Sequence, residues 1–105
     1  MVTIGAVAFA IAYTRSALAE LDALRAHLKA RVADAIHRAL TAAPQTPATN
    51  RKPLPGAHPS FAHTPPLWEL RVGAHRVFYD VDEAARTVYV RAIRAKGRRT
   101  TGEIL

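Results

Sequence analysis

The chain has 105 residues, of which 15 are Lys or Arg and 8 are Asp or Glu, giving a formal net charge of +7. This length predicts a single domain over residues 1–105, and the absence of cysteine excludes a disulfide framework, a thiolate zinc site and a thiol nucleophile. It also favours a reducing, cytoplasmic setting. The excess of positive charge favours phosphate-bearing polymers or acidic protein segments as partners.

The first stretch, residues 2–13, is almost wholly apolar. A membrane-spanning helix needs about 20 apolar residues. A secretory signal needs basic residues ahead of its apolar run, whereas the first basic residue here is Arg15. We therefore expect a buried β-strand and no membrane partner, with residues 1–8 either in that strand or forming a disordered extension ahead of it.

Helical spacing begins at Thr14, whose hydroxyl is suited to cap a first turn. Leucines three and four residues apart are expected to share one face: Leu18, Leu21, Leu24 and Leu28. A second apolar series is spaced by fours: Val32, Ile36 and Leu40. The two series predict either one long helix or a helical hairpin broken near residues 27–29, ending before Pro44.

All seven prolines fall within residues 44–66. Proline removes a backbone donor, so this stretch excludes a helix or a central strand. A structureless connection of this length is usually functional or disordered. Its basic cluster is Asn50, Arg51 and Lys52.

After residue 66 apolar residues recur at every second position, which predicts strands over residues 67–72, 75–81 and 87–93. The turns are Gly73-Ala74 and residues 82–86. The order of elements predicts an α+β fold, β-α-α-β-β-β, with two helices packed on one face of a small antiparallel sheet.

A two-residue turn at Gly73-Ala74 pairs Arg71 with Arg76 and separates two sheet faces. The face expected under the helices carries Trp68, Leu70, Val72, Val77, Tyr79, Val81, Val88, Val90 and Ala92. The other carries Glu69, Arg71, Arg76, Phe78, Asp80, Tyr89 and Arg91. Guanidinium groups bind phosphate oxygens and aromatic rings stack on unpaired bases, so this second face is the candidate site. The alternative is a solvated face on which the two carboxylates neutralise neighbouring arginines.

At these residues the chain resembles the RelE/ParE family of bacterial toxins from type II toxin–antitoxin systems. The resemblance rests on LWELRVGAHRVFYDVDEAARTVYVRAIRAKGR (residues 67–98), NRKPL (residues 50–54) and IAYTRSALAELDAL (residues 11–24). It implies a toxin masked by a cognate antitoxin, a partly disordered chain wrapped around it. It also implies one of two activities: ribosome-dependent cleavage of messenger RNA, or inhibition of DNA gyrase without cleavage.

The resemblance assigns roles to particular residues. In nuclease members the arginine of the HRVFYD-type block supports the transition state, and this is Arg76 here. The arginine of WELR, Arg71, lies beside it. The basic tail Lys96, Arg98 and Arg99 falls where nuclease members carry further active-site side chains.

Metal-independent RNA cleavage needs a base, positive charge at the phosphorane and an acid for the leaving oxygen. Arg76 and Arg71 are the candidates for the charge and Glu69 for the base, with a salt bridge as the other role for Glu69. The candidate RNA-binding residues are Arg91, Lys96, Arg98, Arg99, Arg51 and Lys52. No cofactor is expected, and the histidines lack metal-ligand spacing, so no metal is expected either.

The sequence differs from the RelE branch in two places. Leu67 and Glu69 stand where that branch has two lysines, and residues 100–105 contain no tyrosine where it has one. The sequence therefore leaves three functions open. The preferred one is an endoribonuclease acting on messenger RNA at the ribosome. The others are a gyrase inhibitor and an inactive member that binds its antitoxin and operator DNA.

Overall fold

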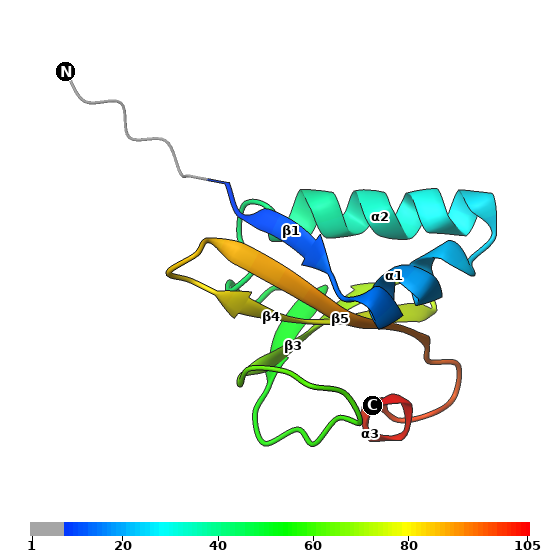
Figure 1. Cartoon of the computed structure of the whole chain (residues 1–105). Coiled ribbons are helices and arrows are strands. Elements are labelled where there is room, and N and C mark those ends of the chain that lie inside the picture. The colour runs from blue at the N-terminus through cyan, green and yellow to red at the C-terminus, as the bar shows by residue number, and fades with distance from the viewer. Residues whose placement is uncertain (1–7) are drawn as a thin grey trace.

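The computed structural model describes residues 8–105, which form a mixed five-stranded sheet in the order β1-β5-β4-β3-β2 (Figure 1). The elements in chain order are β1 (Ala10–Tyr13), α1 (Arg15–Asp22), α2 (Ala26–Leu40), β2 (Arg51–Leu54), β3 (Leu67–Val72), β4 (His75–Asp82), β5 (Thr87–Ala95) and α3 (Thr101–Ile104). Strand β1 runs parallel to β5, and the other neighbouring strands are antiparallel. The predicted α+β class is confirmed.

The apolar N-terminal stretch contributes a short edge strand. Of the expected strand over residues 2–13, the structure describes residues 8–13, and Ala10–Tyr13 of these pairs with β5. Apart from Ala8, the expected extension over residues 1–8 lies outside the described residues.

The helical region forms a hairpin, and its break differs from the expected position. Thr14 caps α1 by accepting a hydrogen bond from the Ala17 amide at 3.1 Å. Helix α1 ends at Asp22 and α2 begins at Ala26, so the break precedes residues 27–29. Helix α1 buries Ala17 and Leu21, whereas Leu18 is 46% exposed. The expected leucine face is therefore wrong at Leu18.

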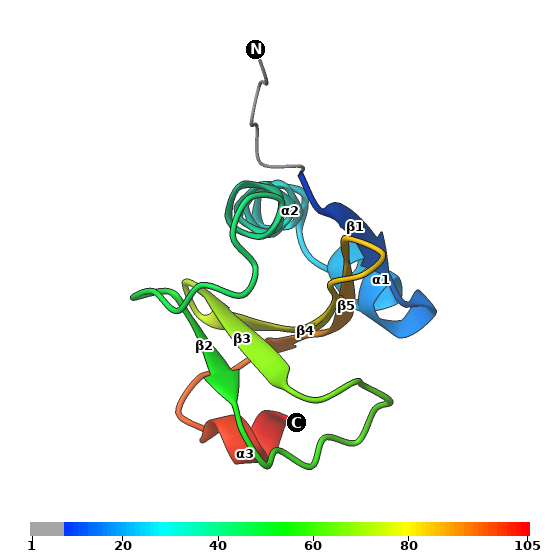
Figure 2. The same ribbon diagram turned by 90° about the vertical axis from the view of Figure 1, so that its left-hand side faces the viewer.

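Helix α2 covers one face of the sheet (Figure 2). Its buried residues are those predicted: Val32, Ile36 and Leu40. They pack on sheet residues that include Trp68, Leu70, Val77, Tyr79, Val88 and Val90. The pairing of β3 with β4 is the predicted one, including Arg71 opposite Arg76.

The opposite face is covered by α3 and by the loop between β2 and β3 (Figure 2). Ile104 of α3 is buried there against Leu67, Phe78 and Ala92. Strand β2 and helix α3 were not expected from the sequence. Strand β2 tolerates Pro53 because it lies at the sheet edge, where a missing N–H is acceptable.

A β-bulge in β5 corrects one face assignment. Phe78 pairs with Ala92, but the next residue, Tyr79, pairs with Val90, so Arg91 is an extra residue. The bulge reverses the alternation of side chains from that point on. Ala92 therefore packs under α3 instead of under α2, and Ile93 takes its place in the helix-side core.

Candidate functional site

Three arginines form a row across the sheet. Arg71 of β3 lies opposite Arg76 of β4, and Arg76 lies opposite Arg94 of β5. Directly opposed like charges destabilise a sheet by a few tenths of a kcal/mol to about 1 kcal/mol. The fold therefore holds positive charge in one place at some energetic cost.

The arginines differ in how they are held. Arg76 donates from Nη1 to the carbonyl oxygens of Gly73 and His75, at 2.9 Å each, so its guanidinium lies against its own hairpin turn. Arg71 is exposed and lines a shallow hollow with Lys52 and Glu69. These two guanidinium groups remain available to an anion.

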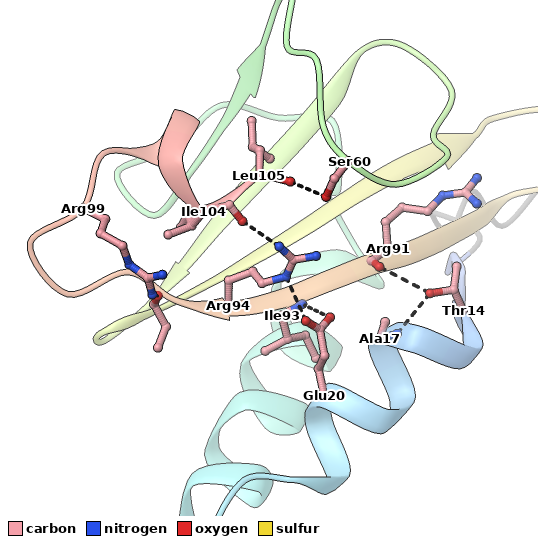
Figure 3. Close-up of polar contacts among 11 residues, drawn as sticks. Thr14, Ala17, Glu20, Ser60, Arg91, Ile93, Arg94, Arg99, Ile104 and Leu105 are labelled. Atoms are coloured by element: carbon pink, nitrogen blue, oxygen red, sulfur yellow. Dashed lines mark hydrogen bonds and ion pairs between the residues drawn. The ribbon is translucent and has the colours of Figure 1, made fainter.

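Arg94 joins two helices to the sheet (Figure 3). Its Nε donates to Glu20 of α1 at 2.8 Å, and its Nη1 donates to the Ile104 carbonyl of α3 at 2.9 Å. Glu20 also accepts the Ile93 amide at 3.0 Å, beyond the point where β1 ends beside β5. The carboxylate thus replaces a missing strand partner and fixes Arg94 in place.

Glu69, the candidate base, is 5% exposed. Its Oε2 accepts a hydrogen bond from the Thr101 hydroxyl at 2.9 Å, which comes from α3. The salt bridge expected as its other role is not formed, since the ion pairs within residues 8–105 do not include Glu69. Its side chain instead helps attach α3 to the sheet face.

Asp80 is the second carboxylate of this face, and it forms a buried ion pair with Arg91. The Arg91 Nε and Nη2 donate to its two oxygens at 2.9 and 3.2 Å, and the Thr64 amide donates at 2.8 Å. The Asp80 side chain is 1% exposed and that of Arg91 20%. The bulge that makes Arg91 an extra residue directs its guanidinium to this carboxylate, away from the row.

The remaining candidate residues divide into bound and exposed groups. Arg51 donates from Nε to the carbonyls of Ala43 and Thr46, at 3.1 and 3.0 Å, and so closes the loop ahead of β2. Arg99 donates to the carbonyls of Ala95 and Lys96. Lys52, Arg98 and Arg99 are exposed, and Lys96 is partly buried.

The arrangement is suited to binding anions and offers little acid–base chemistry. Both carboxylates of the face are buried and hydrogen-bonded, while Arg71 and Arg76 present positive charge. Within the described residues no group of His, Asp and Glu side chains could hold a metal ion. No helix in the same part of the chain is long and apolar enough to cross a membrane.

Sequence reasoning missed Arg94 and Arg31. In VYVRAIRA, Arg91 and Arg94 are three residues apart. A regular strand cannot place residues with this spacing on one face, so the spacing of the two arginines was the sequence feature that could have indicated the bulge. Arg31 of α2 lies with its Nη2 3.5 Å from where a Cβ on Gly73 would stand. That proximity depends on how α2 crosses the sheet, and nothing local to Arg31 indicates it.

The fold matches solved structures. The toxin–antitoxin complex RelBE2 from Mycobacterium tuberculosis aligns with a TM-score of 0.67 at 22% identity, covering 85% of this chain and 92% of that one. The archaeal RelE–RelB complex from Pyrococcus horikoshii aligns with a TM-score of 0.66 at 16% identity, covering 86% and 97%.

In sequence comparisons, no curated protein matches significantly. A sequence model of a toxin family does match: the ParE toxin of the type II toxin–antitoxin system parDE, over residues 11–99. This match spans most of the chain, from β1 through the basic tail, and it agrees with the fold. The chain therefore belongs to the ParE toxin family of type II toxin–antitoxin systems.

Proposed function

We propose that this toxin arrests growth by binding its target without cutting RNA, and that the target is DNA gyrase. The observation that carries the proposal is the state of the two carboxylates on the candidate face. Glu69 and Asp80 are 5% and 1% exposed, and each already accepts hydrogen bonds within the fold.

A general base must come within hydrogen-bond distance of the proton that it removes. Glu69 is 5% exposed and already accepts a hydrogen bond from the Thr101 hydroxyl of α3, so a ribose hydroxyl would have to enter the hollow beside Arg71 and displace Thr101 to reach that oxygen. Asp80 is bound to Arg91 and to the Thr64 amide. The family resemblance leaves gyrase inhibition as the activity that needs no base.

A second candidate is cleavage of messenger RNA on the ribosome. The observation in its favour is that Arg71 and Arg76 lie in register with no carboxylate bound to either. Positive charge held in place can stabilise a pentacoordinate phosphate even where the base comes from elsewhere. This candidate requires Arg76→Ala to abolish toxicity in a protein that remains folded.

The proposal includes a cognate antitoxin as partner. Both solved relatives are complexes of a toxin with its antitoxin. A basic chain of net charge +7 suits a partner that carries acidic segments. Gyrase and translating ribosomes are both cytoplasmic, so the proposal places the toxin there.

The test is a gyrase supercoiling assay with purified toxin and relaxed plasmid. We expect supercoiling to fall as toxin is titrated to a stoichiometric amount over gyrase, and to recover when the antitoxin is added. Glu69→Gln should inhibit like the wild type, because a toxin that does not cut RNA needs no base. Undiminished supercoiling at a large excess of folded toxin would overturn the gyrase assignment.

A further inference from the structure

Three arginines lie around the turn between β3 and β4. Arg71 and Arg76 are opposed across the hairpin, with the Arg76 guanidinium on the Gly73 carbonyl. Arg31 reaches the same turn from α2, with Nη2 at 3.5 Å from the ideal Cβ position on Gly73. We call Arg31, Arg71 and Arg76 the hairpin-tip cluster.

The members of this cluster have no acidic partners in the part of the chain that the structure describes. The ion pairs found in residues 8–105 involve other cations: Lys29, Arg38, Arg91 and Arg94. Glu69, a carboxylate on the same face, is buried and bound to Thr101. The fold thus forms ion pairs with other cations and none with these three arginines.

Their support is rigid. Arg71 and Arg76 project from paired strands, and Gly73 adopts a φ of 58° that favours glycine. A side chain at Gly73 would be strained and would contact the Arg31 guanidinium. Arg31 of α2 and Arg76 of β4 therefore both lie against Gly73, and Arg71 of β3 is opposite Arg76.

Aromatic side chains take no part in the cluster. The cation–ring contacts of the described residues are made by Arg86, Arg91 and Arg94. Proteins that bind single strands combine positive charge with rings on which bases stack. Charge without rings instead suits the regularly spaced phosphates of a double helix, which are bound without reading bases.

We propose that the hairpin-tip cluster binds the phosphate backbone of duplex DNA, independently of sequence. Such contact would let the toxin itself hold DNA. The duplex could be the one bound by gyrase or the operator beneath a toxin–antitoxin complex. The proposal does not rest on gyrase as target, because the binding is measured without it.

The experiment is fluorescence anisotropy of a labelled 20-base-pair duplex of arbitrary sequence with purified toxin, repeated over a range of salt concentrations. Each phosphate contact contributes about 0.9 to the slope of log affinity against log salt. Arg31→Ala and Arg71→Ala should each lower the slope by about that amount, equally for two unrelated duplexes.

Arg38→Ala is the matched control. It lies on the same helix as Arg31 and removes the same charge, but Arg38 is paired with Asp34 at 2.9 Å. It should leave the salt slope unchanged, and circular dichroism should show all variants folded. Two further assays with Arg31→Ala identify which duplex is contacted. Weaker gyrase inhibition by the variant indicates the duplex bound by gyrase, and weaker operator binding by the toxin–antitoxin complex indicates the operator.

Three results would overturn the proposal. The first is an equal decrease of the salt slope in Arg31→Ala and Arg38→Ala, which would mean that the net charge of the protein, and not this cluster, attracts the DNA. The second is tighter binding to the corresponding single strand than to the duplex. The third is no measurable duplex binding at low salt by folded toxin.

Discussion

The substitution Asp80→Asn tests the claim that the Asp80–Arg91 pair is structural. The asparagine has the shape of the aspartate but only one acceptor oxygen for donors that now bind at 2.8, 2.9 and 3.2 Å. Its amide group would face a donor, and Arg91, only 20% exposed, would lose its counter-charge. Removing one partner of a buried ion pair costs about 3–5 kcal/mol. Because Arg91 keeps some contact with water, we expect about 3 kcal/mol.

The assay is urea unfolding of the purified toxin, followed by circular dichroism at pH 7. A domain of this size is stable by about 5–15 kcal/mol, so the expected loss is a large fraction of the total. Asp34→Asn is the control, since Asp34 and Arg38 are 59% and 79% exposed and the pair should contribute less than about 1 kcal/mol. Losses below about 1 kcal/mol for both variants would refute the assignment of Asp80 to the fold.

Two further predictions concern titration. Burial raises the pKa of Tyr79 above its ordinary value of 10.0, so the folded phenol keeps its proton while the unfolded one loses it. The urea midpoint of the wild type should be constant below pH 10 and should decline above it, and Tyr79→Phe should reduce that decline. At pH 7 the same substitution should lower the free energy of unfolding by about 1–3 kcal/mol, because the Pro44 carbonyl loses its hydrogen-bond donor. The Thr100 amide hydrogen bond lowers the pKa of Glu103, so its contribution to α3 is present above the ordinary carboxyl pKa and is lost as the pH falls through the lowered value. Acidification should therefore speed up amide hydrogen exchange at Ile104, measured by NMR, and Glu103→Gln should abolish that pH dependence. If the variant keeps the same pH dependence, a group other than Glu103 is responsible for it.

Much of the sheet followed from local pattern. The strands β3, β4 and β5 alternate with a period of two, and the Gly73-Ala74 turn fixes the register, so Arg71 could be placed opposite Arg76 from sequence. The capping role of Thr14 followed in the same way. These features depend on neighbours within a few residues.

The rest depended on contacts between distant segments. The bulge at Arg91 moved Ala92 to the other face, and nothing adjacent to Ala92 requires that move. The hydrogen-bond partner of Glu69 is Thr101, 32 residues away, in a helix of four residues whose one buried residue is Ile104. The pattern of charges suggested a base free to act, whereas α3 supplies a hydrogen bond that already occupies the base.

The most direct test of a toxin that binds without cutting is to map messenger RNA 5′ ends across a bacterial transcriptome within minutes of inducing the chain without its antitoxin. The account predicts that the wild type arrests growth with no new 5′ ends inside translated regions. New ends inside translated regions that disappear with a folded Arg76→Ala protein would contradict it and establish the nuclease.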